Sequence, residues 1–233
     1  MDLKKKELHI ILQKSLENAS EKRKLVLNNP KLLKAKIDLK TFQINRLKST
    51  HSDLAQNPGT KDATEFFLNE LYGFKDLRKR DKEAAKLIPL IVKMFPTETL
   101  KVITDSFVLD SLTEDLETEM AQNLVNDNIT LESLTDELYW KYYLKNSTKE
   151  ERLLQLNYVR DIGYELCSIT RFPLIEQVLK MMRLPAKLAN LTEIHNFLEH
   201  GFFTFKKTKD PEKFIDSIYY RELAIINNAF FSQ

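Results

Sequence analysis

The segment Ala63–Phe95, ATEFFLNELYGFKDLRKRDKEAAKLIPLIVKMF, decides the fold of this chain. Its first arm has apolar residues at the i, i+3, i+4 spacing of a buried helix face, namely Ala63, Phe66, Phe67 and Leu71. Its second arm repeats the pattern with Leu77, Ala84, Ile88, Ile91 and Phe95. The residues Tyr72-Gly73-Phe74 between the arms have the composition of a turn. The segment therefore predicts a helical hairpin, bent at Pro89 where a helix hydrogen bond is lost.

Asp81 falls on the apolar stripe of the second arm. A carboxylate in line with a core needs a partner, or its pKa rises until the group is neutral. Because the two arms run antiparallel, Glu70 and Asp81 are expected at the same end of the hairpin, within reach of Arg46. We interpret this end as a polar pocket for an anion or a small ligand, formed by Arg46, Glu70, Tyr72, Arg80, Asp81 and His195. The alternative is a structural Arg–Asp pair that fixes the register of the helices.

The rest of the chain shows the same helical periodicity. Only 4 glycines and 7 prolines in 233 residues leave few places for turns, which favours long helices over many short strands. No stretch alternates apolar and polar residues as a half-buried strand would. We expect an all-α multi-helix bundle of about nine or ten helices and no sheet. It forms a single domain over 1–233, in which residues 1–28 are a peripheral N-terminal helix.

Local signals predict where several helices begin. Residues 31–55 are expected to form one helix. The segments 111–114 (SLTE) and 148–151 (TKEE) both have the spacing of a capping box, so each predicts a new helix start. The first of these would follow a helix that ends at Leu109. Gly163 predicts the close approach of a neighbouring helix, because a glycine inside a helix otherwise costs about 1 kcal/mol.

An aromatic cluster is the best candidate for an interface in the sequence. Tyr139, Trp140, Tyr142 and Tyr143 lie within five residues of one expected helix. They cannot all face inward, so one or two rings should be exposed. Exposed Tyr and Trp side chains are good interface anchors. The alternative is that a neighbouring segment covers them.

Two residues could begin a metal site. His195 and Glu199 stand one turn apart on one expected helix, but the paired Glu-x-x-His motifs of di-iron bundles and the His-Glu-x-x-His motif are both missing. We therefore predict no metal and no cofactor, with His195 and Glu199 as the weak candidates. Cys167 has no base nearby in the sequence and is expected in the core.

Charge and cysteine usage limit the classes of partner. The net charge is only +2, so there is no overall attraction toward nucleic acid or an anionic membrane. No apolar run approaches the roughly 18 residues of a membrane span. A single cysteine fits a reducing compartment. We expect a cytoplasmic protein, with secretion without a signal peptide left open.

The first quarter of the chain is basic, with Lys31, Lys34 and Lys36 close together. A solvated helix face is the default interpretation of such a run. Contact with nucleic acid through these lysines is the third and least favoured reading.

Two groups of residues form motifs that are fairly specific as a set. The first is Leu39-x-x-Phe-Gln-x-x-Arg-Leu47, Asp53-Leu54, Ala63, Phe66-Phe67-Leu68-x-x-Leu71-Tyr72-Gly73 and Arg80-Asp81. The second is Phe197-Leu198-Glu199-x-Gly201-Phe202-x-x-Phe205. Together they resemble a family of uncharacterised bacterial proteins over about Leu33 to Phe231. Because the family's function is unknown, the resemblance implies no reaction, cofactor or partner.

The sequence favours a non-catalytic protein-interaction or regulatory module that is bacterial and self-associating. Its partner would be another protein or a second copy. The alternative is a helical ligand- or metal-binding protein, including an oxygenase-like enzyme, that takes a small molecule in the polar pocket. The first reading predicts a metal-free oligomer, and the second predicts a co-purified ligand.

Overall fold

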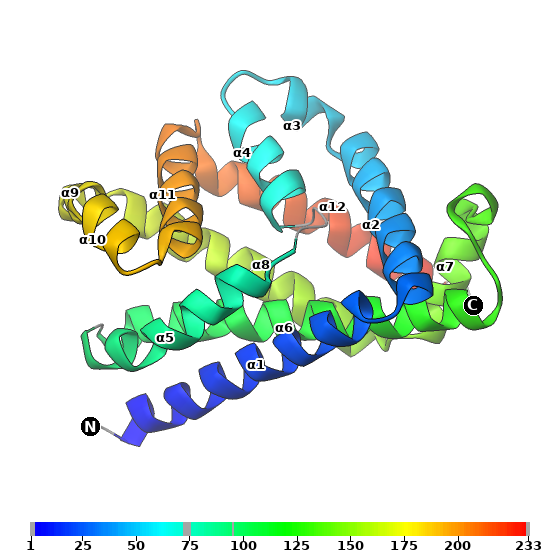
Figure 1. The fold of residues 1–233 in the computed structure, drawn as a ribbon. Helices are drawn as coiled ribbons and strands as arrows, with labels where there is room; N and C mark the ends of the chain where they lie inside the picture. Colours follow the sequence, from blue (N-terminus) through cyan, green and yellow to red (C-terminus); the bar gives the residue numbers. More distant parts are fainter. Residues whose placement is uncertain (1–2, 72–75, 95, 232–233) are drawn as a thin grey trace.

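The computed structural model describes residues 3–71, 76–94 and 96–231 (Figure 1). Over these ranges the chain is all-α and contains no strand, which confirms the predicted fold class. None of the described helices is long and apolar enough to cross a membrane.

The helices have the following bounds, with a π-helix (η1) and a 3₁₀-helix (η2) among them. They are α1 Leu3–Leu27, α2 Pro30–Thr50, α3 Ser52–Gln56, α4 Lys61–Phe66, η1 Phe67–Leu71, α5 Arg78–Met94, α6 Thr97–Asn126, η2 Leu131–Ser133, α7 Asp136–Lys145, α8 Lys149–Thr170, α9 Pro173–Met181, α10 Arg183–Leu188, α11 Thr192–Lys207 and α12 Pro211–Phe231.

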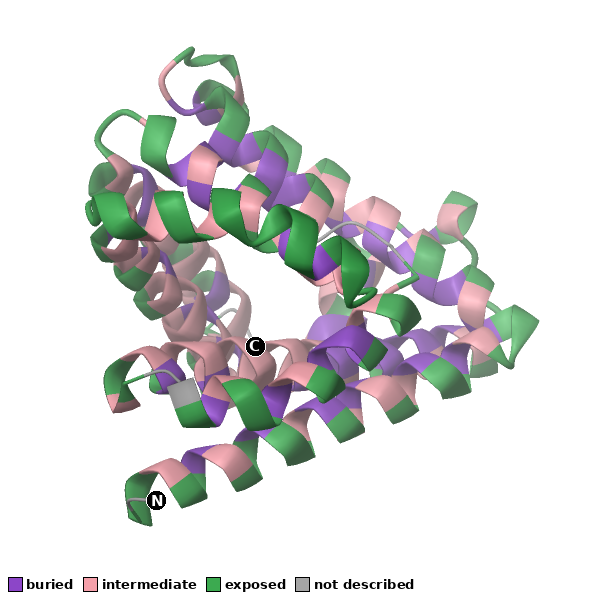
Figure 2. Ribbon diagram, turned by 60° about the vertical axis from the view of Figure 1, so that its left-hand side comes forward, coloured by how far each residue is buried: buried purple, intermediate pink, exposed green. Residues whose placement is uncertain are grey.

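The 30-residue helix α6 is the shared neighbour in this arrangement, and α1, α2, α7 and α8 all pack on it. Three apolar clusters hold the helices together. One joins α1, α5 and α6, a second joins α2, α6 and α7, and a third joins α4, α8, α11 and α12. Figure 2 shows the buried residues on the sides of the helices that face one another.

Helix α1 lies along α5 and α6 and buries Leu8, Leu12 and Leu16 there. Each fully buried leucine contributes roughly 1.5–3 kcal/mol, so this helix has a substantial packed face. A single domain with a peripheral helix at 1–28 stays a prediction.

Several helix starts and one close contact follow the sequence signals. Asn29 caps α2 by accepting a hydrogen bond from the Leu32 N–H at 3.2 Å. Thr148 and Glu151 form the predicted capping box of α8. A Cβ on Gly163 would meet the Ile215 side chain at 2.9 Å, so this glycine allows α8 and α12 to approach closely, as predicted.

Two predicted boundaries are wrong. Residues 31–55 do not form one helix, because the chain breaks at His51 between α2 and α3. The segment 111–114 begins no helix, because α6 runs through it without a break. Its capping pattern has another cause: Ser111 accepts a hydrogen bond from Asn18 at 2.8 Å, and Glu114 pairs with lysine and arginine side chains of other helices. The predicted turn at 72–74 lies outside the described residues.

Candidate functional site

The partner of Asp81 is Arg23 of α1 and not Arg46, which the sequence had placed within reach. Arg23 donates from Nη1 to Asp81 Oδ2 at 2.8 Å and from Nη2 to Asp110 Oδ1 at 2.5 Å. Arg80 Nη2 lies 3.1 Å from one oxygen of each of these carboxylates. The result is a four-membered charged ring that joins α1, α5 and α6.

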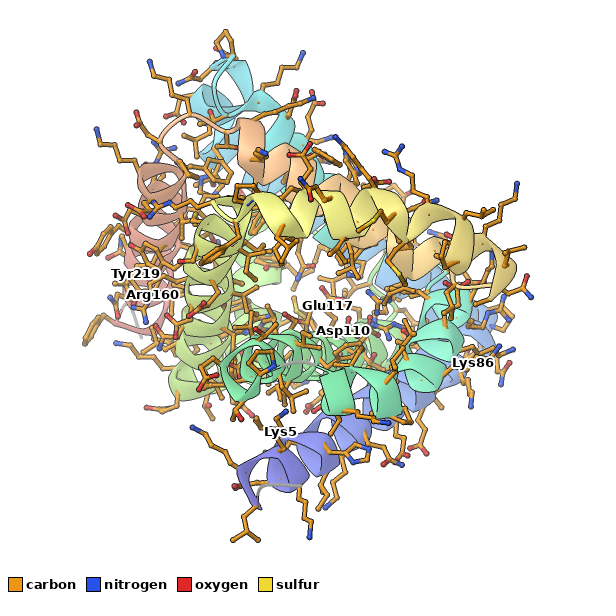
Figure 3. The ribbon with its side chains drawn as sticks, turned by 90° about the vertical axis from the view of Figure 1, so that its left-hand side faces the viewer. Lys5, Lys86, Asp110, Glu117, Arg160 and Tyr219 are labelled. Atoms are coloured by element: carbon orange, nitrogen blue, oxygen red, sulfur yellow. The ribbon has the colours of Figure 1, made fainter. Side chains whose placement is uncertain are left out.

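A second set of ion pairs lies next to this ring, further along α6. Lys36 of α2 donates to Glu114 at 2.5 Å and to Thr118 at 3.0 Å. Lys40, one turn further along α2, lies 2.8 Å from Glu117. Figure 3 shows Asp110 and Glu117 among the helices rather than at the outline of the molecule. We call the whole set the buried ion network; it contains Arg23, Lys36, Lys40, Arg80, Asp81, Asp110, Glu114 and Glu117.

The buried ion network is balanced in charge, with four cations and four carboxylates as defined above. Lys36 is only 2 % exposed and Glu117 only 3 %. Burial opposes the charged form of Arg23, but the neighbouring Asp110, Glu114 and Asp81 raise its pKa. Burial likewise opposes ionisation of Asp110, yet Arg80 and Arg23 hold its pKa below the usual value. The charges therefore neutralise one another inside the protein, as a device that fixes helix register would require.

The structure distributes the six predicted pocket residues over several places. Arg80 and Asp81 lie together in the buried ion network. Arg46 binds Glu222, with its two nitrogens 3.2 and 2.8 Å from the carboxylate oxygens. His195 binds the Leu179 carbonyl oxygen through Nε2 at 2.9 Å.

The other two predicted pocket residues are Glu70 and Tyr72. Glu70 lines a groove that is described below. Tyr72 lies outside the described residues.

A second polar cluster joins α2 to the last helix. His51 Nε2 lies 3.0 Å from Glu222 Oε1, on the carboxylate that Arg46 also holds. The Arg46 guanidinium lies 5.8 Å from the centre of the Trp140 ring. Burial disfavours the ionised form of Glu222, but the hydrogen bond from His51 and the charge of Arg46 lower its pKa overall. This α2–α12 cluster brings together residues more than 170 positions apart in the chain.

The expectation that one or two rings of the aromatic cluster are exposed is wrong. Tyr139, Tyr142 and Tyr143 are buried, and Trp140 is half-buried. Phe42 of α2 stacks on Tyr139 with 4.8 Å between ring centres, and Phe230 of α12 lies 6.2 Å from Tyr143. Helix α7 is covered on more than one side, because α6 and α12 both pack on it. The four rings are thus occupied by packing within the chain.

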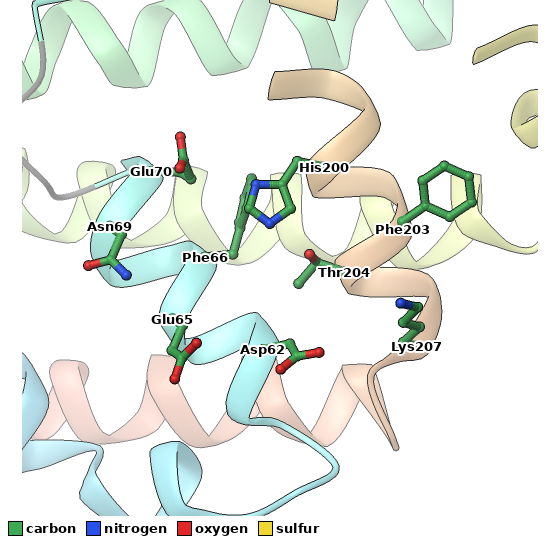
Figure 4. A pocket seen from close by; sticks show the side chains of 9 residues that line it. All are labelled: Asp62, Glu65, Phe66, Asn69, Glu70, His200, Phe203, Thr204 and Lys207. Carbon is green, nitrogen blue, oxygen red and sulfur yellow. The ribbon is translucent and has the colours of Figure 1, made fainter. Parts of the chain in front are cut away.

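A groove of about 330 Å³ runs between α4–η1 and α11 (Figure 4). Glu70 and His200 lie on its opposite walls, and the His200 ring meets the Phe66 ring edge-on at 5.1 Å. Gly201 permits this packing, because a Cβ there would come within 3.1 Å of the Phe66 ring. The two motifs of the sequence therefore meet along this groove. A π-helix such as η1 is often found at functional positions, which makes the groove a candidate for ligand binding.

The two weak metal candidates are held by other groups. His195 bonds to the Leu179 carbonyl, and Glu199 pairs with Arg183 at 2.8 Å. Within residues 3–71, 76–94 and 96–231, no three His, Cys, Asp or Glu side chains are grouped so that they could hold a metal ion. Cys167 is buried in an apolar cluster, as predicted, and burial raises the pKa of its thiol.

An exposed apolar segment is the feature that sequence reasoning missed. Among residues 173–188, all of which the structure describes, only Ala186 is buried. Seven large apolar residues in and beside this segment are each at least 42 % exposed, and we call them the α9–α10 apolar surface. They are Phe172, Leu174, Val178, Met181, Met182, Leu184 and Leu188. Figure 1 shows α9 and α10 at one end of the molecule, beside α11.

This surface could not be recognised from periodicity alone. Leu174, Val178 and Met181 have the i, i+4, i+7 spacing of a helix face that packs on a core. The same spacing arises when the face is left open. The available signal was the concentration of large apolar residues in two short helices. Helices this short cannot bury so many large side chains against the rest of the chain.

The comparisons with known proteins concern the family alone. No curated protein and no solved structure shows a significant match to the chain. One family model matches residues 22–233, from the end of α1 to the C-terminus. The expectation of an uncharacterised family is confirmed, because the chain belongs to the family described as a domain of unknown function (DUF8198).

Proposed function

We propose that the chain is a protein-interaction module without a catalytic centre of its own. The observation that carries this proposal is the α9–α10 apolar surface. Seven large apolar side chains are exposed there within 17 residues, and a concentration of exposed apolar side chains of this kind supports a binding site for another chain. Other residues of α9 contact α8 and α11, and α10 contacts α11, which leaves these seven side chains open.

The state of the ionisable groups supports the non-catalytic part of the proposal. A general acid, base or nucleophile needs a side chain whose reactive atom can reach a substrate. Asp81 instead binds Arg23, and Glu114 binds Lys36 in the balanced network. Glu222 likewise binds Arg46 and His51. These contacts fit a rigid scaffold that presents a surface.

The alternative reading, a helical ligand-binding protein, is supported by the groove between α4–η1 and α11. Its acidic residues Asp62, Glu65 and Glu70 suit a group that carries a positive charge and donates hydrogen bonds, whereas Lys207 suits a negatively charged group of the same small molecule. Native mass spectrometry of the purified protein tests this reading. It predicts that a small molecule is bound to the protein. The fraction of protein that carries it should fall in His200→Ala and stay unchanged in Glu150→Ala, on the exposed side of α8.

The remaining expectations belong to the same proposal. A bacterial origin and a cytoplasmic location rest on composition and on the single cysteine. The nucleic-acid reading loses one of its three lysines, because Lys36 is buried in the ion network.

Photo-crosslinking tests the proposed function. A photoreactive residue replaces Leu174 on the α9–α10 apolar surface, and in a matched protein it replaces Lys141, which is exposed on α7 beside the aromatic cluster. Irradiation of cells that produce the protein is expected to give protein adducts from position 174 and few from position 141. If position 174 gives no adduct with any protein, the proposed function is wrong. If only position 141 reacts, the interface lies at the aromatic cluster instead.

A further inference from the structure

Exposed large hydrophobic side chains are concentrated on the α9–α10 apolar surface. The described residues include 17 exposed large hydrophobic side chains, and seven of them fall between Phe172 and Leu188. The others are spread over helices of the rest of the chain, which is normal for a protein surface. This concentration indicates a surface that binds a partner.

The area of the surface matches the requirement of a stable dimer. Taking about 180 Å² for a whole large apolar residue, the exposed fractions of the seven residues together correspond to roughly 750 Å². A typical specific interface buries about 800 Å² on each partner, whereas the largest apolar patch on an ordinary monomer is about 300–600 Å².

The charges around the surface favour an apolar, uncharged occupant. Arg171 pairs with Glu212 at 2.6 Å, Lys180 with Glu176 at 2.6 Å and Arg183 with Glu199 at 2.8 Å. Each of these three cations at the rim is therefore paired with a carboxylate of its own chain, and Glu176 also pairs with Lys206. An anionic lipid surface or an acidic peptide would have to displace those carboxylates, whereas an apolar face needs no such exchange.

The stripe on α9 complements itself. Leu174 and Met181 lie about one turn before and after Val178, at roughly 6 Å and 4.5 Å along the axis. If a second α9 runs antiparallel with its Val178 opposite the first, each Leu174 meets a Met181. Phe172 at the start of one α9 then lies toward the beginning of the other copy's α10, where Leu184 is exposed.

We propose that a second copy of this chain covers the α9–α10 apolar surface, with the two α9 helices antiparallel about a two-fold axis at Val178. This inference rests on the proposed function and adds to it the identity of the partner and the geometry of contact. An interface of this kind uses the same patch on both subunits, so it closes at two copies.

Cysteine crosslinking of the purified full chain tests the geometry. The native Cys167 is buried, so the wild-type protein serves as the unreactive background. Under mild oxidation, Val178→Cys is expected to form a disulfide-linked dimer. Leu174→Cys and Met181→Cys are each expected to react poorly alone and to form a mixed dimer when combined. Leu154→Cys, at an exposed apolar position on α8, is the matched control and should stay monomeric on a denaturing gel.

Sedimentation supplies the second measurement. The wild-type protein is expected to be a dimer, and Leu174→Asp is expected to be a monomer with unchanged helix content, whereas Leu154→Asp should remain dimeric. A dimer whose mass is insensitive to Leu174→Asp, or one that Val178→Cys fails to crosslink, overturns the inference. A wild-type monomer at all concentrations also overturns it, but the proposed function survives if position 174 still crosslinks to a foreign protein in cells.

Discussion

Lys34 and Lys36 lie two positions apart on α2 and have opposite surroundings. Lys34 is exposed and pairs with Asp38 one helical turn away. Lys36 is buried and binds Glu114 and Thr118 of α6. An exposed pair of this kind contributes about 0.3–0.5 kcal/mol, because water screens both charges. Removal of one partner from a buried pair costs about 3–5 kcal/mol, because the other charge is left without compensation.

The two lysines therefore make a matched pair of substitutions. We expect Lys36→Met to lower the free energy of unfolding by about 3–5 kcal/mol and Lys34→Met to lower it by less than about 1 kcal/mol. Urea denaturation at pH 7 measures both. The double variant Lys36→Met/Glu114→Gln should recover part of the loss, because it removes the carboxylate that has lost its lysine partner and keeps only the longer contact with Arg23. Equal costs for the two single variants would show that the buried ion network contributes nothing particular to stability.

At the level of the element, α6 shows how a buried polar stretch can be mistaken for a helix boundary. Its face is apolar at Leu100, polar at Asp110, Glu114 and Glu117, and apolar again from Met120. The sequence 111–114 has the residue types of a capping box, but the helix continues through them and their side chains bind α1 and α2.

A proline substitution distinguishes a helix start from a helix interior. Proline is tolerated at the first position of a helix but costs about 3 kcal/mol or more inside one. We expect Leu112→Pro to destabilise the protein by at least about 3 kcal/mol, because it falls within α6. Lys149→Pro occupies the first position of α8, after Thr148, and should cost less than about 1 kcal/mol. Thermal unfolding followed by circular dichroism compares them. Tolerance of Leu112→Pro would mean that a new helix begins at residue 111 after all.

What could be predicted from the sequence depended on whether the deciding interaction is local. The cap at Thr148 involves Glu151, three positions away, and it was predicted correctly. The partner of Asp81 is Arg23, 58 residues away, and periodicity carries no information about which helix supplies it. The apolar stripe of α9 was equally visible in the sequence, but only the packing shows that no described helix covers it.

At the level of the whole molecule, the α2–α12 cluster ties the first quarter of the chain to its last helix. Arg46 and His51 of the first quarter hold one carboxylate of α12, Glu222. Apolar packing between these helices is otherwise supplied through α7, since Phe42 and Phe230 both contact its tyrosines. The charged contact is therefore one of the direct connections between α2 and α12, beside the hydrogen bond that Arg221 of α12 donates to the Thr50 carbonyl oxygen of α2 at 3.2 Å, and it requires Glu222 to be ionised.

This requirement gives the stability a predictable dependence on pH. The pKa of Glu222 is lower in the folded protein than its ordinary value of 4.5, chiefly because His51 and Arg46 outweigh the cost of burial. The unfolded chain therefore takes up the proton first as the pH falls. The contribution of Glu222 is fully present above pH 4.5 and is lost as the pH falls through the folded-state pKa.

We expect Glu222→Gln to cost about 1.5–3 kcal/mol at pH 7, the range for hydrogen bonds to a charged group. The difference from wild type should shrink steadily between pH 5 and pH 3. Urea midpoints measured across this range test the prediction, with Glu212→Gln, which breaks only the exposed pair with Arg171, as the control that should change little at any pH. A cost of Glu222→Gln that stays constant from pH 7 to pH 3 would mean that the ionised form of Glu222 does not hold α2 and α12 together.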